Sequence, residues 1–249
     1  MRPAKVCAIV LSPDSSESGL MVLLQGPLAL IGGSEWRDGC SFDLRLLEFS
    51  NADEVLVLPT AAAYEYPDRA VETAAHYFGA LGIKIRPVMV LSHSEAMYDE
   101  YAKIVSEAKF IYIGGGSPLH LRSVLKDTPT WSAIVSAWQR GAVVAGSSAG
   151  GMVLSDPMVD PRGGAFTLGL GLIRNIALIP HYEEWSTDRR KRTHDLGSKN
   201  VVSVGVDERT ALIRWPNGQW ESLGQGRVEA IHLGEEIALG ELENYVEIP

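Results

Sequence analysis

The chain has 249 residues, of which 46% are hydrophobic and 21% charged, and this globular composition excludes disorder, collagen and coiled coil as descriptions of the whole chain. The net charge is −9, from 22 lysines and arginines against 31 aspartates and glutamates, so the basic footprint of a nucleic-acid-binding protein is missing. The two cysteines, Cys7 and Cys40, form neither a CxxC metal pattern nor a disulfide framework, and they favour a cytoplasmic location.

Residues 1–26 are predicted to be an N-terminal extension in front of a single domain that covers residues 27–249. A short apolar run follows two positive charges near the start, but it is too short for a secretory signal and no convincing cleavage site follows it. An alternative is that Met21 is the true first residue. No run of about 18 apolar residues occurs, so we expect no membrane partner.

Between residues 28 and 145, apolar runs alternate with amphipathic patterns. The runs do not alternate internally, which is typical of parallel strands covered on both faces. The predicted strands are 28–31, 55–58, 85–91, 110–113 and 142–145, and the predicted helices are 68–81, 94–108 and 128–140. Strands that alternate with helices predict an α/β fold, a three-layer α/β/α sandwich around a mostly parallel sheet.

After about residue 200 the pattern changes to short strands separated by turns such as Pro216-Asn-Gly218. The predicted strands here are 201–206, 211–215, 227–233 and 236–239. No linker rich in Pro, Ser or Gly separates this part from the rest. The pattern therefore predicts a C-terminal antiparallel β extension of the same domain.

The sharpest local signal is Gly146-Ser-Ser-Ala-Gly150, a G-x-S-x-G pattern that directly follows the predicted strand 142–145. In a tight strand–turn–helix elbow the central serine, Ser148, projects above the sheet, and its neighbours two residues away must be very small. The N–H group of Ala149 would lie at the helix start, where negative charge is stabilised. The alternative is a glycine-rich turn with solvent-facing serines.

A second glycine cluster, Gly114-Gly-Gly116, follows the predicted strand 110–113. Carboxyl ends of parallel strands share one edge of a sheet, so an N–H group of Gly115 or Gly116 could pair with that of Ala149 to form an oxyanion hole. A plain tight turn and a phosphate-binding loop are the alternatives. Neither the G-x-G-x-x-G nor the G-x-x-x-x-G-K-[ST] pattern is present here, which disfavours nucleotide binding.

A serine nucleophile needs a base and a group that orients the base. His181 ends the apolar run 176–180, so it is expected at a strand's carboxyl edge beside Ser148. Asp207 and Glu208 follow the predicted strand 201–206 and are favoured as the acid by the same argument, while Asp156 and Asp160 stay open. The other histidines are less well placed: His76, His93, His120, His194 and His232.

These residues resemble the S51 family of serine peptidases, which includes peptidase E and cyanophycinase. The resemblance runs from about Gly26 to Arg214. Its anchors are Ile31-Gly-Gly33, Ile113-Gly-Gly-Gly116, Gly146-Ser-Ser-Ala-Gly150, Gly169-Leu-Gly-Leu172 leading to Pro180-His181, and Gly205-Val-Asp-Glu-Arg-Thr-Ala-Leu212. It implies a flavodoxin-like fold similar to class I glutamine amidotransferases, a small peptide substrate and no cofactor. No ligand pattern implies a metal, and a homodimer stays open.

The resemblance implies that Ser148 is the nucleophile, His181 the general base and Glu208 the third residue, matching the cyanophycinase-type triad. Two departures bear on the substrate. Ser147 stands where peptidase E members typically have Trp, and their third residue is often an Asp between serine and histidine, which keeps Asp156 and Asp160 open. The segment that ends at His181 is closer to the dipeptidases than to the D-Q-H-F of cyanophycinase.

The basic run Arg189-Arg-Lys-Arg192 lies where the family's substrate-carboxylate contacts arise, so the resemblance implies that Arg190 or Arg192 binds an acidic residue or a peptide C-terminus. The alternative is a solvated helix face. The expected activity is a serine peptidase acting on small peptides, of dipeptidase or cyanophycinase type, with acidic or isoaspartyl residues as candidates. A small-molecule amidase or esterase with the same triad and a non-catalytic binding module are the alternatives, whereas serine in place of cysteine disfavours glutamine amidotransfer.

Overall fold

A computed structural model describes residues 25–248 apart from residues 163 and 198. The predicted extension 1–26 therefore lies outside the described residues except for Gln25 and Gly26, and Cys7 lies outside them as well.

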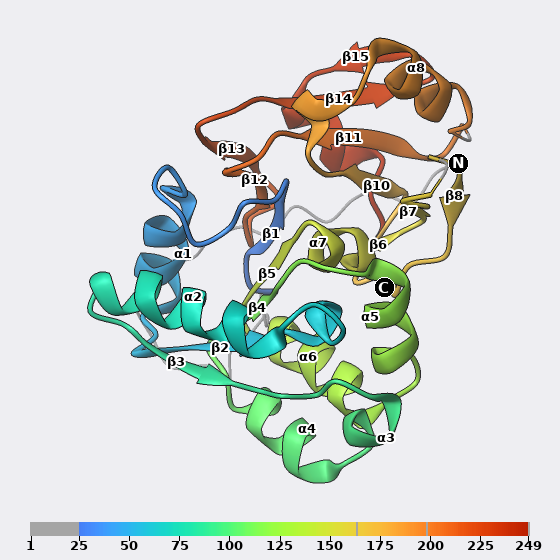
Figure 1. Ribbon diagram of the computed structural model, residues 1–249. Helices are drawn as coiled ribbons and strands as arrows, with labels where there is room; N and C mark the ends of the chain where they lie inside the picture. The colour runs from blue at the N-terminus through green and yellow to red at the C-terminus, as the bar shows by residue number, and fades with distance from the viewer. Residues whose placement is uncertain (1–24, 163, 198, 249) are drawn as a thin grey trace, which may run out of the picture.

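A seven-stranded sheet forms the centre of the molecule (Figure 1). Five of its strands are parallel: β1 (Leu28–Ile31), β2 (Glu54–Leu58), β3 (Lys84–Pro87), β4 (Phe110–Ile113) and β5 (Val143–Ser147). The antiparallel strands β12 (Thr210–Arg214) and β13 (Trp220–Gly224) complete it, in the order β13-β12-β1-β5-β4-β2-β3. The carboxyl ends of the parallel strands therefore share one edge.

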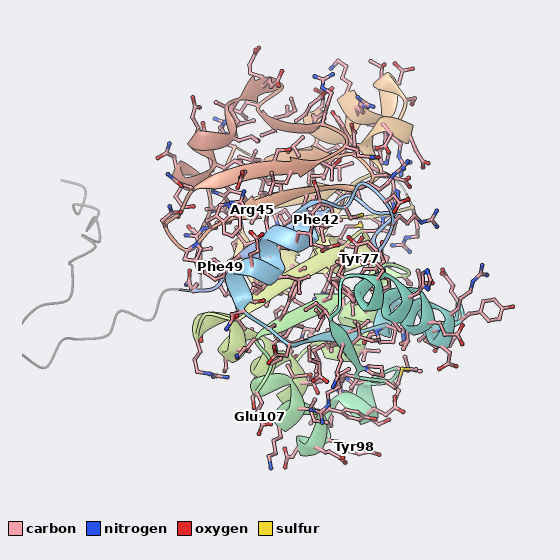
Figure 2. The ribbon with its side chains drawn as sticks, turned by 90° about the vertical axis from the view of Figure 1, so that its left-hand side faces the viewer. Phe42, Arg45, Phe49, Tyr77, Tyr98 and Glu107 are labelled. Atoms are coloured by element: carbon pink, nitrogen blue, oxygen red, sulfur yellow. The ribbon has the colours of Figure 1, made fainter. Side chains whose placement is uncertain are left out.

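Both faces of this sheet are apolar because each is covered by helices. Leu28 and Leu30 pack toward α5 (Pro118–Leu125) and α6 (Pro129–Gln139), whereas Ala29 and Ile31 pack toward α1 (Phe42–Ser50) and α2 (Pro67–Ala80). Figure 2 shows α1 across the second face, with Phe42, Arg45 and Phe49 along its length. This arrangement confirms the three-layer α/β/α architecture.

The helices differ from the predictions in two ways. The predicted helix 94–108 is divided into α3 (His93–Ala96) and α4 (Asp99–Ser106), because the capping box of Ser92 and Glu95 starts a short helix that ends before Tyr98. The helices α1 and α5 were not predicted, and α8 (Thr187–Asp195) agrees with the alternative of a solvated helix around Arg189-Arg-Lys-Arg192. The predicted strand 85–91 is also shorter, since β3 ends at Pro87, which has no N–H group for the ladder.

A second sheet has six strands in the order β15-β14-β11-β10-β6-β9. They are β6 (Ser155–Asp156), β9 (Ile173–Arg174), β10 (Ile176–Ile179), β11 (Val202–Val206), β14 (Val228–His232) and β15 (Glu235–Ile237). The predicted C-terminal antiparallel extension is present here as β11, β14 and β15. β11 also pairs in parallel with β10, and β12 and β13 leave this sheet and join the central one.

The remaining described elements are short: α7 (Ala149–Leu154), the hairpin of β7 (Met158–Val159) with β8 (Phe166–Thr167), and three 3-10 turns at Thr60–Ala62, Tyr182–Glu184 and Leu239–Asn244. Within residues 25–248, as far as they are described, no helix combines the length and the apolar character needed to cross a membrane.

Candidate active site

Ser148 lies between β5 and α7, at the carboxyl edge of the central sheet. Its backbone has φ 47° and ψ −110°, a strained conformation for a residue with a side chain. The tight turn leaves no space at Gly150, where a Cβ atom would stand 2.3 Å from the carbonyl oxygen of Ile113. The strand, turn and helix of the predicted elbow are therefore present.

His181 follows β10 of the second sheet, and the glycines after β1 let it reach the central sheet. Its N–H group donates to the carbonyl oxygen of Gly32 at 2.8 Å. Its ring lies against Gly33, where φ is +123° and a Cβ atom would stand 2.2 Å from the ring carbon Cε1. The glycine pair 32–33 thus allows the imidazole to pack where a side chain would block it.

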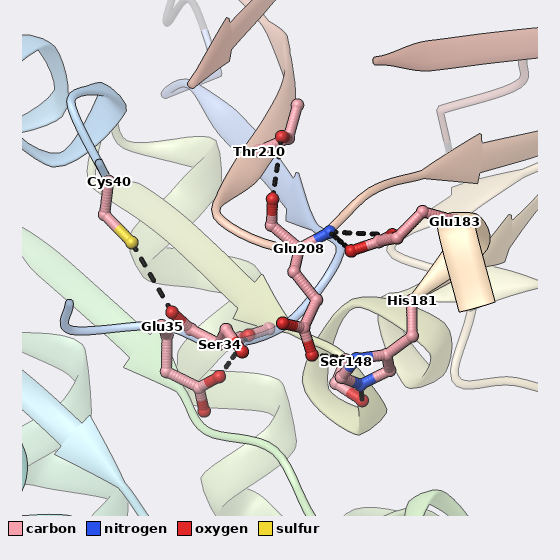
Figure 3. A network of polar contacts seen from close by, with 9 residues as sticks. Ser34, Glu35, Cys40, Ser148, His181, Glu183, Glu208 and Thr210 are labelled. Atoms are coloured by element: carbon pink, nitrogen blue, oxygen red, sulfur yellow. Dashed lines mark hydrogen bonds and ion pairs between the residues drawn. The ribbon is translucent and has the colours of Figure 1, made fainter. Parts of the chain in front are cut away.

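The side chains of Ser148, His181 and Glu208 form a continuous hydrogen-bonded chain (Figure 3). Ser148 Oγ lies 3.0 Å from His181 Nε2, and His181 Nδ1 lies 2.8 Å from Glu208 Oε1. Glu208 stands where the chain crosses from β11 to β12, and therefore from the second sheet to the central one. The structure brings together three residues that the sequence places far apart.

The pKa of Glu208 is lowered from its ordinary value. A hydrogen bond with Ser34 is the largest cause, and the hydrogen bond and charge of His181 act in the same direction, while burial opposes them. Glu183 accepts the backbone N–H group of Glu208 with both carboxylate oxygens, at 2.9 and 3.1 Å. Sequence reasoning missed Ser34 and Glu183, which lie in turns where periodicity carries no signal.

The other candidate acids have different partners. Asp156 accepts from the N–H group of Gly169, and Asp160 binds Arg162, whose hydrogen bonds lower the pKa of Asp160 to about 2. Asp207 accepts the N–H group of Arg227. The remaining histidines with a hydrogen bond lie outside this chain of contacts: His93, His120, His194 and His232. Glu208 is thus the carboxylate that meets His181.

The three predicted oxyanion donors, Ala149, Gly115 and Gly116, have different backbone surroundings. Ala149 is the first residue of α7, where N–H groups have no acceptor within the helix. Gly115 departs from the expectation, because its N–H group donates to Glu35 Oε1 at 2.9 Å. Gly116 packs against Ala61, and its role, like that of Ala149, stays a prediction.

Glu35 is a site residue that sequence reasoning missed. Its second oxygen, Oε2, accepts a hydrogen bond of 2.6 Å from Ser147 Oγ (Figure 3 shows Glu35 beside Ser34). The sequence signal that could have identified Glu35 is its position two residues after the glycine pair 32–33. Glu35 therefore connects the loop after β1 with the glycine loop after β4 and with the end of β5.

Arg190 and Arg192 lie on α8, which follows the turn after His181. The guanidinium group of Arg190 donates to the carbonyl oxygens of Trp185 at 3.0 Å and Tyr182 at 2.6 Å, and it lies 4.0 Å from the centre of the Tyr182 ring. These contacts hold the turn beside His181 and favour a structural role for Arg190. Substrate binding by Arg190 or Arg192 stays a prediction.

A hollow of about 900 Å³ lies away from these residues, at the amino edge of the central sheet. Arg45, Phe49 and Trp215 line part of it, and Figure 2 shows the first two on α1. Ligands of parallel sheets bind at the carboxyl edge, which is where Ser148 stands. Across the described part of the chain, no three His, Cys, Asp or Glu side chains cluster so that they could hold a metal ion.

Comparison with known proteins connects this geometry to one family. The family model described as peptidase family S51 matches residues 28–218. A cyanophycinase from Synechococcus elongatus is 23% identical over 186 residues, which cover 70% of this chain and 57% of that protein, so the chain spans less than two thirds of this relative. A Bacillus subtilis (strain 168) protein named uncharacterized peptidase YgaJ is 29% identical over 184 residues, 70% of this chain and 76% of that one.

Solved structures agree with the fold. The crystal structure of a peptidase from an acI-B1 Actinobacterium has a TM-score of 0.76 at 29% identity and covers 87% of this chain and 98% of its own. A putative peptidase E protein from Listeria monocytogenes EGD-e has a TM-score of 0.58 at 18% identity, with 84% and 99% covered, and supports the fold alone.

Proposed function

The chain belongs to peptidase family S51, and on that premise we propose that it hydrolyses small peptides with Ser148 as nucleophile, His181 as general base and Glu208 as the residue that orients His181. Membership makes it a serine hydrolase of peptidase type. The observation that carries the assignment of residues is the unbroken contact from Ser148 Oγ through the imidazole to Glu208, at 3.0 and 2.8 Å.

In the proposed reaction His181 Nε2 takes the proton of Ser148 Oγ while that oxygen attacks the carbonyl carbon of the peptide bond. The negative charge that develops on the carbonyl oxygen is stabilised by the N–H groups of Ala149 and Gly116. His181 then gives its proton to the leaving amine, and water, activated by the same imidazole, hydrolyses the acyl-enzyme.

Glu208 supports both proton transfers. Its carboxylate accepts from His181 Nδ1, so Nε2 is left without a proton and faces Ser148. Because the pKa of Glu208 is lowered, the carboxylate stays ionised at neutral pH and stabilises the imidazolium ion that forms during the reaction.

The substrate class is proposed separately from the three catalytic residues. We propose a dipeptide or a cyanophycin-like peptide, with acidic or isoaspartyl residues as candidates, since cyanophycinases are among the relatives. A cytoplasmic location is part of the same proposal. Hydrolysis of small amides or esters by the same three residues is the competing activity.

The test compares the wild-type protein with Ser148→Ala on a panel of dipeptides and of p-nitrophenyl esters. We expect the substitution to lower kcat by about 10³-fold or more with unchanged folding, because the attacking oxygen is removed. Ser123→Ala, an exposed position on α5, is the matched control. Full activity of folded Ser148→Ala would contradict the assignment, and ester hydrolysis without peptide hydrolysis would favour the competing activity.

A further inference from the structure

We propose that Glu35 determines specificity by binding the α-ammonium group of the substrate residue whose carbonyl carbon Ser148 attacks. The enzyme would then cleave the first peptide bond of peptides with a free N-terminus. This inference rests on the proposed function, and it assigns a role to a carboxylate that the triad does not use.

Glu35 and Ser148 border the same gap beside the glycine loop. A Cβ atom placed on Gly115 would stand 3.3 Å from Glu35 Oε1 and 3.5 Å from Ser148 Cβ. The absence of a side chain at residue 115 thus leaves open the space that borders both the carboxylate and Ser148 Cβ. A substrate whose carbonyl carbon reaches Ser148 passes close to Glu35.

The carboxylate of Glu35 is held in place and has capacity for a further partner. Oε1 accepts from the N–H group of Gly115 at 2.9 Å, and Oε2 accepts from Ser147 Oγ at 2.6 Å. A carboxylate offers about four lone-pair sites, so each oxygen can accept again. The side chain is only partly buried, so a ligand can approach it.

The carboxylate of Glu35 has no cationic partner among the residues that the structure describes. The ion pairs around the site do not involve Glu35, and Glu208 is the carboxylate that faces His181. The neighbouring acid Asp43 is fully buried, and burial together with the charge of Glu35 raises its pKa. The negative charge at the gap therefore matches a cation supplied by the substrate.

Both position and charge favour an α-ammonium group over a lysine or arginine side chain. An α-ammonium group lies two bonds from its own carbonyl carbon, as a carboxylate beside the nucleophile requires, whereas lysine carries its charge on a four-carbon stem. A bare carboxylate also repels the oxyanion that forms nearby, and a bound ammonium ion cancels that repulsion in the transition state. A free N-terminus should therefore increase the rate as well as the binding.

The experiment compares Glu35→Gln with the wild-type enzyme on pairs of peptides that differ only in an N-terminal acetyl group. Glutamine keeps an acceptor for Gly115 and a polar group for Ser147 but carries no charge. We expect the wild type to prefer the free amine by about 10- to 100-fold in kcat/KM, the size expected of a hydrogen bond to a charged group. Glu35→Gln should lose this preference, with kcat/KM falling for the free peptide and unchanged or higher for the acetylated one.

Equal losses for both members of each pair would overturn the inference, since they would mean that Glu35 only holds the glycine loop. A wild type that does not distinguish the pairs would overturn it too. Glu72→Gln, an exposed change on α2, is the matched control. Calorimetry on Ser148→Ala, with and without Glu35→Gln, measures the same preference as binding without turnover. If Ser148→Ala is active, the proposed triad is wrong. If Ser148→Ala binds free and acetylated peptides equally well, the proposed role of Glu35 is wrong.

Discussion

At the scale of single residues, Ser148 and His181, the proposed nucleophile and base, both have positive φ angles, and His181 is in the left-handed helical region. The φ angles of Ser148 and His181 are 47° and 50°, a conformation that costs about 1–3 kcal/mol for each residue. Their N–H groups donate to neighbouring carbonyl oxygens at the end of β1, those of Ile31 and Gly32, at 2.9 and 2.8 Å. The end of β1 therefore fixes the backbone positions of these two residues relative to each other.

Glu208→Gln should keep the hydrogen-bonding shape beside His181 and remove the charge. We expect kcat to fall by about 10²- to 10⁴-fold with little change in KM, because the imidazolium ion loses its counter-charge. The pKa of Glu208 is lower in the folded protein than its ordinary value of 4.5. Ionised Glu208 therefore stabilises the fold at pH values above 4.5, and this stabilisation is lost as the pH falls through the pKa of the folded state. Steady-state kinetics and unfolding midpoints between pH 3 and pH 7 check both points, with Glu236→Gln as control. Unaltered kcat would count against the orienting role.

Asp43 is a fully buried carboxyl group in the first turn of α1. Burial raises its pKa well above the ordinary 3.8, so the folded state keeps a proton that the unfolded chain loses, and stability falls as the pH rises. Asp43→Asn should remove this slope, which is about 1.4 kcal/mol per pH unit, and should be more stable than the wild type at pH 7. Parallel stability curves for the two proteins between pH 4 and pH 7 would show that Asp43 is ionised.

At the scale of elements, the elbow between β5 and α7 depends on small residues. The Cβ atom at Gly150 would meet backbone at 2.3 Å, whereas the one at Gly79 in α2 has no atom within 4 Å. Gly150→Ala should therefore lower the free energy of unfolding by about 1–3 kcal/mol and reduce kcat, while Gly79→Ala should raise stability by about 0.4–1 kcal/mol. Urea unfolding and activity measured on both variants test this contrast, which would fail if Gly150→Ala were as stable and active as Gly79→Ala.

The sequence predicted the elements whose signal is local. The strands β1 and β4 were placed at their observed bounds because both faces are apolar, and His181 and Glu208 were placed at strand ends by the same pattern. The parallel pairing of β10 with β11 was missed because the two strands are separated in the chain by the turn after His181 and by α8. Glu35 lies in a loop, where the chemistry depends on neighbours that periodicity does not specify.

At the scale of the whole molecule, the 3-10 turn Leu239–Asn244 is bound to the central sheet by an ion pair with the buried Arg214. Arg214 of β12 is 6% exposed and donates to both oxygens of Glu243 at 3.0 and 2.6 Å, and Trp220 Nε1 donates to the same carboxylate. This contact lies at the amino edge of the sheet, since Arg214 pairs with Leu28. It therefore contributes to stability at a distance from Ser148.

Glu243→Ala should leave Arg214 buried without its partner, and we expect the free energy of unfolding to fall by about 2–3 kcal/mol, less than for a fully buried pair because Glu243 is partly exposed. At denaturant concentrations below the unfolding transition, kcat/KM should stay unchanged. Chemical denaturation beside the exposed control Glu241→Ala measures the difference. A loss no larger than that of the control would show that Arg214 finds solvent or another acceptor.

The strand β1 lies between β5 and β12, and β12 is synthesised long after both of them. Until the ribosome has delivered residues 202–214, one flank of the first strand is unpaired and the imidazole has no carboxylate behind it. A nascent chain would therefore carry its serine in an inert form through most of translation. The three proposed catalytic residues would come together only when β12 pairs with β1, late in the synthesis of the chain.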